Sequence, residues 1–141
     1  VVDHLGLVKS TTQKPRTIEL GDITDELATI AKDFNIAVVV LCQLNRSLES
    51  RDNKRPELHD LRNSGEIEEN AACVLGLYRP AYYLEKTKHD DMAKELDRKE
   101  QLKKIENDYE VHVLKQRNGP LGEVKLSCHM PTNSIGNKGR Y

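Results

Sequence analysis

Apolar residues in the first third of the chain follow two different patterns. Five of them recur at the spacing of one helical face: Ile23, Leu27, Ile30, Ala31 and Phe34. This spacing predicts a helix over about 21–35 whose apolar face packs on a sheet. Residues 36–42, IAVVVLC, are apolar without alternation, which predicts a strand covered on both faces, as in a parallel sheet. With the end of an earlier strand at Val1–Val2, these segments predict a right-handed βαβ unit.

Polar segments and short apolar runs alternate over the rest of the chain. Residues 45–59 are almost wholly polar and predict a mobile surface loop. A short helical piece then leads into a second buried strand at 73–78, and residues 85–108 form a charged insertion with a solvated helix at about 91–106. The runs YEVHVLKQ and EVKLSC flank the turn-forming RNGPLG and predict an antiparallel hairpin. A loose tail is expected over about 130–141.

The composition is that of a globular protein and says little about what the protein binds. The 141 residues predict one domain over 1–141, and 37% hydrophobic with 32% charged residues predict a small core under a polar surface. The 22 Lys and Arg nearly balance 23 Asp and Glu, so bulk charge predicts neither nucleic-acid nor membrane binding, and any anion site must be local. The three cysteines are far apart and no long apolar run occurs, so we expect free thiols, no membrane span and a cytoplasmic location.

Two polar residues stand at the carboxyl ends of the predicted parallel strands. Asp3 lies where an apolar strand meets a loop, and a carboxylate held there suits a Mg²⁺ ion that bridges nucleotide phosphates. Gln43 follows the next strand and should lie beside Asp3 if the two strands are neighbours. Its amide could bond a phosphate oxygen or an attacking water. Each residue taken alone could equally satisfy loop backbone.

Cationic residues mark two further candidate sites. Arg62 lies among small polar residues just ahead of a helical start, where it could contact phosphates of single-stranded DNA or belong to a simple helix cap. Lys115 and Arg117 are two apart on a strand beside a tight turn, so both should point to the same face. Two cations aimed together suit a γ-phosphate, although two exposed strand cations remain the alternative. We expect Arg46 and Arg51 to be solvated loop charges.

Taken in order, four segments resemble the motor domain of the replicative DnaB-type DNA helicases. They are VVDHL as a Walker B element, LCQLNRSLESR, RPELHDLRNSGEIEENA and LKQRNGPLGEV. The resemblance implies the α/β fold class and, within it, an incomplete RecA-like P-loop ATPase core. The part expected here is the C-terminal one, with parallel strands, flanking helices and a terminal β-hairpin.

The resemblance also implies roles for matching positions. Asp3 is expected to hold Mg²⁺, and Gln43 to sense the γ-phosphate of ATP. Lys115 and Arg117 are expected to reach the ATP of a neighbouring subunit. Three residues are expected in the loop that grips single-stranded DNA: Arg62, Asn63 and Gly65. The whole protein is expected to use ATP and Mg²⁺ to move 5′ to 3′ on single-stranded DNA as a hexameric ring, with primase and a helicase loader as candidate partners.

The sequence also departs from this family. Asn63 stands where the family usually has Glu, and Asn70 and Ala72 stand where it usually has acids. No G-x-x-x-x-G-K-[ST] motif occurs, and the chain begins at Val1 inside a strand without an initiating Met, which suggests a fragment. We therefore expect this chain alone not to complete an ATP site. A non-catalytic remnant that keeps DNA-binding or oligomerisation surfaces and another RecA-like ATPase are the alternatives.

Overall fold

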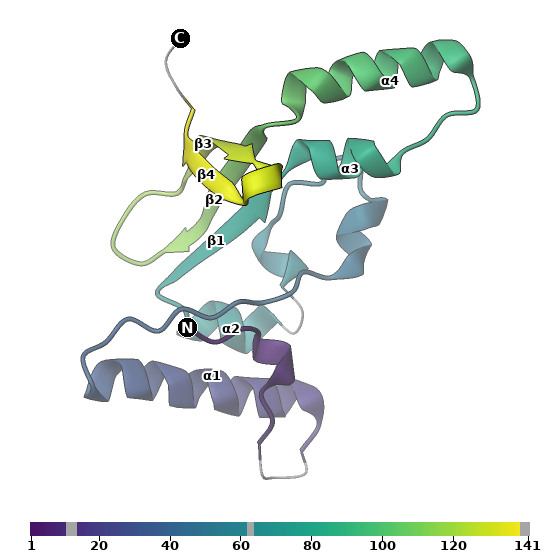
Figure 1. Cartoon of the computed structure of the whole chain (residues 1–141). Helices are drawn as coiled ribbons and strands as arrows, with labels where there is room; N and C mark the ends of the chain where they lie inside the picture. The colour runs from purple at the N-terminus through teal and green to yellow at the C-terminus, as the bar shows by residue number, and fades with distance from the viewer. Residues whose placement is uncertain (11–13, 62–63, 139–141) are drawn as a thin grey trace. The chain divides into compact units, whose positions relative to one another are not determined.

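Two structural units make up the described part of the chain. The computed structural model describes three ranges: 1–10, 14–61 and 64–138. The first unit comprises 1–74 with 114–120, and the second comprises 75–113 with the residues from 121 onward (Figure 1). The length of the chain predicted one domain, and within it the contacts of the chain form these two clusters.

The first unit is built on the long helix α1 (Arg16–Asp33). It begins five residues before the predicted start at 21, directly after Pro15, and an ion pair between Arg16 and Glu19 at 2.5 Å supports its first turn. The helix contributes Leu20 and Ile23 to a buried hydrophobic cluster, in which they pack with Leu5. The predicted apolar face is buried only in its first half, since Ile30 and Phe34 are 42% and 72% exposed.

The two predicted parallel strands are reduced to a short contact in this unit. Val2 and Val40 form a parallel bridge, and the amide of Leu5 donates to the carbonyl of Leu41 at 2.9 Å. The prediction that residues 36–42 are covered on both faces is wrong here. Three of them are about half exposed: Ile36, Val39 and Leu41. The reason is that, within the described part of the chain, the segment around Val2 is the only strand-like neighbour that pairs with this run.

The polar segment after this run, predicted as a surface loop over 45–59, is more ordered locally than its composition indicates. It contains two 3₁₀ turns, η2 (Arg46–Ser50) and η3 (Leu58–Asp60), and it buries Leu48 and Asp60 to 3% and 2% exposure. The next element, α2 (Ser64–Asn70), is the predicted short helical piece.

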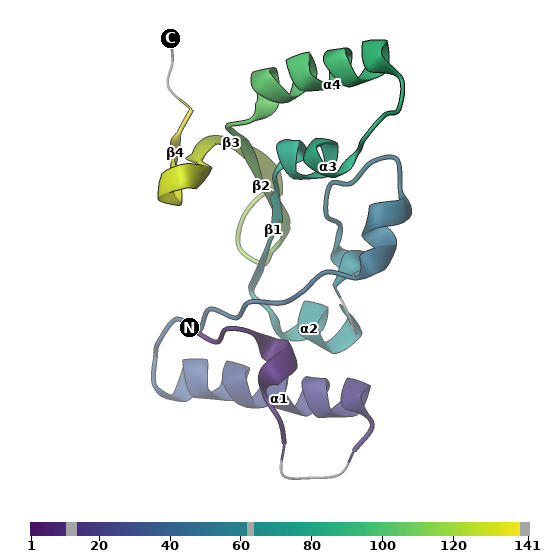
Figure 2. The ribbon, with the colours of Figure 1, turned by 45° about the vertical axis from the view of Figure 1, so that its right-hand side comes forward.

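Helices α1 and α2 pack closely together, as both views of the ribbon show (Figures 1 and 2). Gly21 on α1 faces the side chain of Glu66 on α2. A Cβ atom at this position would lie 2.8 Å from the carboxyl carbon of Glu66 on α2. A side chain at position 21 would therefore require the Glu66 carboxyl group to move.

A four-stranded sheet in the order β1–β2–β3–β4 organises the second unit. Strand β1 (Cys73–Tyr78) has the predicted bounds, although Leu75 and Leu77 on its outer face are exposed. The predicted hairpin is confirmed as the antiparallel pair β2 (Asp108–Gln116) and β3 (Gly122–His129). Residues 117–121 form its turn.

Helices of the second unit occupy the predicted charged insertion and the residues before it. Helix α3 (Pro80–Lys86) starts on Pro80 at a favoured first-turn position, and α4 (Met92–Ile105) matches the predicted solvated helix. The carboxylate of Asp91 caps α4 by accepting from the amides of Ala93 and Lys94 at 2.8 and 3.2 Å. Figure 2 shows α3 and α4 side by side.

The chain from residue 130 is folded as far as it is described, so the predicted loose tail is wrong for residues 130–138. A 3₁₀ turn, η4 (Met130–Thr132), leads to Asn133, whose left-handed φ of 48° reverses the chain. Strand β4 (Ser134–Asn137) then pairs antiparallel with β3. None of the described helices is long and apolar enough to cross a membrane.

Candidate functional site

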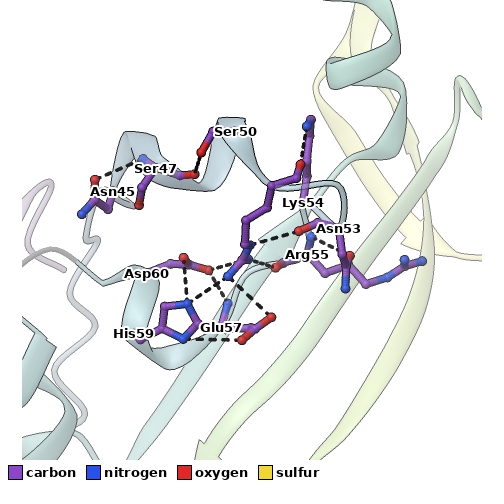
Figure 3. Close-up of polar contacts among 10 residues, drawn as sticks. Asn45, Ser47, Ser50, Asn53, Lys54, Arg55, Glu57, His59 and Asp60 are labelled. Atoms are coloured by element: carbon purple, nitrogen blue, oxygen red, sulfur yellow. Dashed lines mark hydrogen bonds and ion pairs between the residues drawn. The ribbon is translucent and has the colours of Figure 1, made fainter.

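Arg51 holds the folded polar segment of the first unit together. Its guanidinium contacts Glu57, His59 and Asp60. Figure 3 shows these three side chains close together. The nearest charged partner of the guanidinium is the buried Asp60 carboxylate at 2.9 Å. The guanidinium also donates to the main-chain carbonyls of Asn53 and Arg55 at 3.1 and 2.7 Å. The prediction of a solvated loop charge is therefore wrong for Arg51, because its side chain is only 27% exposed.

We expect Arg51→Ala to destabilise the protein by about 2 kcal/mol, because it leaves the Asp60 carboxylate buried without its cation. The free energy of unfolding in urea measures this loss. Arg46→Ala is the matched control, since Arg46 is an exposed arginine of the same segment. We expect the control to stay within about 0.5 kcal/mol of the unsubstituted protein. Equal losses in the two variants would show that the Arg51 network does not stabilise the fold.

A small cavity lies where the two short parallel segments of the first unit end. Its volume is about 140 Å³, and its lining includes His4, Gly6, Cys42 and Gln43. Asp3 is exposed and directly precedes this lining. The sequence-predicted Gln43 and the residues that follow Asp3 thus share one site. Burial raises the pKa of the Cys42 thiol above its usual range, so that the thiol form is favoured in the cavity wall.

Lys115 and Arg117 both contact the carboxyl end of α2. The prediction that both lie on a strand is correct only for Lys115, because β2 ends at Gln116 and Arg117 lies in the turn that follows. The ammonium of Lys115 donates to the main-chain carbonyls of Glu68 and Glu69, the latter at 3.2 Å. The guanidinium of Arg117 donates to the carbonyls of Glu69 and Asn70 at 2.6 and 3.5 Å. The last carbonyls of a helix lack partners within the helix and carry partial negative charge, so they attract cations.

Only one of the three candidate DNA-contact residues, Gly65, lies within the described part of the chain. Arg62 and Asn63 fall outside the described residues. Gly65 is exposed in the first turn of α2, and a Cβ there would meet nothing within 4 Å. Gly65 therefore borders open space on this unit.

Sequence reasoning missed the role of Asn70 in this unit. Its amide nitrogen lies 2.5 Å from a carboxylate oxygen of Asp25 and 3.2 Å from the hydroxyl of Thr24, both on α1. The sequence marks Asn70 only as a departure from the family, because its partners are 46 and 45 residues away.

The second unit contains a separate recess that the sequence did not predict. Its volume is about 290 Å³, and its lining includes Tyr82, Tyr83 and Tyr109 together with Arg79. Two hydrogen bonds of 3.1 and 2.7 Å join the Arg79 guanidinium to Glu85, and they raise the pKa of Arg79. Burial raises the pKa of Tyr109. The recess is chemically suited to a flat or apolar group, with its cation already balanced by Glu85.

Three side chains of the second unit come close enough to be tested as metal ligands. Glu110, His112 and Glu123 each offer an atom within 4.8 Å of the others. The Nε2 atom of His112 lies 2.9 Å from Glu110, however, and its Nδ1 atom lies 3.9 Å from Glu123. The imidazole thus lies between two carboxylates that face different ring nitrogens, and we assign this cluster no metal.

Comparisons of the sequence with known proteins agree with the resemblance found in the four segments. The model of the family described as "DnaB-like helicase C terminal domain" matches residues 1–137. The replicative DNA helicase DnaB of Rickettsia felis is 39% identical over 138 residues, which are 96% of this chain and 28% of that protein. The replicative DNA helicase DnaC of Bacillus subtilis is 34% identical over 139 residues, which are 97% of this chain and 27% of that protein.

Two solved structures share the fold of this chain. One, a DnaB-like replicative helicase studied with its interactions with primase, has a TM-score of 0.79 at 30% identity, over 97% of this chain and 29% of that one. The other is an ATPase domain with a TM-score of 0.78 at 29% identity, over 98% of this chain and 43% of that one. The predicted fold class, a partial α/β ATPase core, is confirmed by this likeness. The chain spans less than a third of the length of the curated relatives it matches.

Proposed function

The chain belongs to the DnaB-like helicase C-terminal domain family, and on that premise we propose that it forms part of an ATP-dependent replicative DNA helicase. The observation that carries this proposal is the family match over residues 1–137. The complete protein would act as a hexameric ring that moves along single-stranded DNA and separates the duplex. Likeness to a helicase solved with its primase interactions supports primase as a candidate partner.

Asp3 and Gln43 are the proposed contribution of this chain to its own ATP site. Asp3 offers an exposed carboxylate and makes no ion pair among the described residues, so its oxygens fit the hard-ligand preference of Mg²⁺. The bound ion would offset charge on the phosphates of ATP. Gln43 lines the adjoining cavity, where its amide could hydrogen-bond a phosphate oxygen.

Lys115 and Arg117 are the proposed contribution to the ATP site of a neighbouring subunit. Both cations converge on one point, and the carbonyls that they contact carry only partial negative charge. A γ-phosphate offers full negative charge and several acceptor oxygens, so it would compete effectively for the same two donors. Arg117 is exposed at the turn after β2, as a finger that acts across a subunit boundary needs to be.

Arg62, Asn63 and Gly65 are the proposed contact with single-stranded DNA, on the strength of their matching positions in the family. We expect Arg62→Ala in a full-length subunit to weaken single-stranded DNA binding equally for all sequences, because a phosphate contact carries no base information. The slope of log affinity against log salt should fall by about 0.7, the value for one phosphate on a single strand. Fluorescence anisotropy with several oligonucleotides over a salt series measures both effects.

Lys103→Ala provides the control for this experiment, because Lys103 is an exposed cation on α4, an element of the second unit. It should change neither the affinity nor the salt slope. An Arg62→Ala effect confined to particular DNA sequences, or one matched by the control, would argue against the proposed phosphate contact.

A further inference from the structure

We infer that Asn70 is a positioning residue for Lys115 and Arg117, because it fixes the carboxyl end of α2 on which both cations rest. The inference rests on the proposed function, since it concerns the two cations assigned there to a neighbour's ATP. All the residues involved belong to the first unit.

The side-chain amide of Asn70 ties α2 to α1 through two acceptors. It lies 2.5 Å from an Asp25 carboxylate oxygen and 3.2 Å from the Thr24 hydroxyl. The Thr24 hydroxyl is buried and donates its own hydrogen to the carbonyl of Gly21 at 2.8 Å, so its oxygen is left to accept. In this arrangement both partners accept from position 70, where an amide NH₂ supplies two hydrogens and a carboxylate supplies none.

Asn70 is also part of the helix end that Lys115 and Arg117 contact. The carbonyls of Glu69 and Asn70 accept from Arg117, and that of Glu69 also accepts from Lys115. A shift in the last turn of α2 would move these acceptors and, with them, the resting positions of both cations. Helix α2 has only seven residues, so a side-chain tie to α1 at this end has a large influence on where its carbonyls lie.

Helix α2 also lies between the proposed DNA contact and the two proposed trans-acting cations in the sequence and contacts of this unit. Its first turn follows residues 62 and 63 of the proposed DNA contact, and its last carbonyls hold the proposed trans-acting cations. A positioning role for Asn70 therefore predicts an effect on turnover of ATP more than on its binding. A role limited to stability predicts a lower unfolding temperature with catalysis unchanged in the folded protein.

Exchange of the two partners tests the inference in a full-length subunit. Asn70→Asp places a carboxylate against Asp25, so the two groups repel and the tie is broken. The double variant Asn70→Asp/Asp25→Asn restores the contact to position 25 with donor and acceptor exchanged. The Thr24 hydroxyl can then turn from the Gly21 carbonyl and donate to the new carboxylate. Asp25→Asn alone keeps an acceptor oxygen opposite Asn70 and is the matched control. Steady-state ATP hydrolysis with single-stranded DNA gives kcat and KM, and thermal unfolding gives stability.

We expect Asn70→Asp to lower kcat by roughly tenfold with little change in KM, as for contacting groups that are strongly coupled. The double variant should return to within about threefold of the unsubstituted protein, and the control should stay close to it. Should Asn70→Asp fail to fold, Asn70→Ala removes the tie without adding charge and should lower kcat in the same direction.

Two results would overturn the inference. One is a fall in unfolding temperature with kcat unchanged, which would assign Asn70 a structural role only. The other is a loss of kcat that the double variant fails to restore although it folds. Failure of the proposed function looks different, because the unsubstituted protein would then show no DNA-stimulated ATP hydrolysis, or Arg117→Ala would leave hydrolysis unchanged.

Discussion

Arg117→Ala is expected to lower ATP hydrolysis by about 10³-fold in a complete ring while ATP binding is nearly retained. The guanidinium of an arginine finger acts on charge that develops in the transition state, so its loss affects the chemical step more than the bound ground state. Phosphate release gives kcat, and titration with a fluorescent ATP analogue gives Kd. Binding and chemistry should therefore separate in this one variant.

A second cation of the same hairpin supplies the control for this experiment. Lys125 lies on β3 with a 67% exposed side chain, and Lys125→Ala should retain nearly full hydrolysis. Arg117 also contacts the carboxyl end of α2, so the unfolding temperature must be followed in parallel. Full activity of Arg117→Ala rings would reject the finger, and a fall in hydrolysis explained by unfolding would assign Arg117 to the fold.

The second large effect concerns the 141-residue chain by itself, which is expected to show no ATP hydrolysis above a buffer blank. The sequence contains no G-x-x-x-x-G-K-[ST] motif, so it lacks both the backbone cradle and the lysine that neutralise phosphate charge. Asp3 and Gln43 could contact only part of the nucleotide.

Release of labelled phosphate over several hours is sensitive enough for this comparison. The Asp3→Ala form of the same chain controls for contaminating ATPases, because both forms should match the blank. Turnover that the 141-residue chain shows and the Asp3→Ala form loses would mean that a working site exists within these residues.

Local signals in the sequence predicted several elements closely. Asp91 caps α4 at a position two residues before Ala93, and the turn-forming residues 117–121 set the hairpin of β2 and β3. Strand β4 escaped prediction because Ser134–Asn137 is too short to show an alternating pattern. It forms through pairing with β3, which is a tertiary interaction.

The remaining differences between the sequence predictions and the structure involve residues whose partners are distant in the sequence. The run 36–42 has the composition of a covered strand, but its exposure depends on which segments lie against it. Arg51 has the sequence context of a loop charge until Asp60 and two main-chain carbonyls are brought around it. Polar composition alone does not distinguish a solvated loop from a segment folded around one guanidinium.

The candidate site could be predicted from the sequence only in part, because some of its contacts are local and others join distant residues. The side chains of Lys115 and Arg117 were predicted to point to the same face, and both contact the carbonyl of Glu69, although Arg117 lies just beyond the end of β2. Their acceptors on α2 are main-chain carbonyls, which leave no signature in the sequence. The tie from Asn70 to Asp25 is equally hidden, because 45 residues separate the two partners.

Mixed rings test most directly the central claim that each ATP site is shared between two subunits. Full-length subunits with Asp3→Ala keep Arg117 but lack the proposed Mg²⁺ ligand, and subunits with Arg117→Ala have the reverse defect. Rings of either kind alone lack one half of every site. In rings assembled from equal amounts, about a quarter of the interfaces should join an intact Asp3 to an intact Arg117.

ATP hydrolysis by these mixed rings is the decisive measurement, with mixing verified by native mass spectrometry. The shared-site account predicts that hydrolysis returns toward about a quarter of that of unsubstituted rings when sites act independently. Hydrolysis that stays at the level of the separate variants, in rings shown to be mixed, would contradict it.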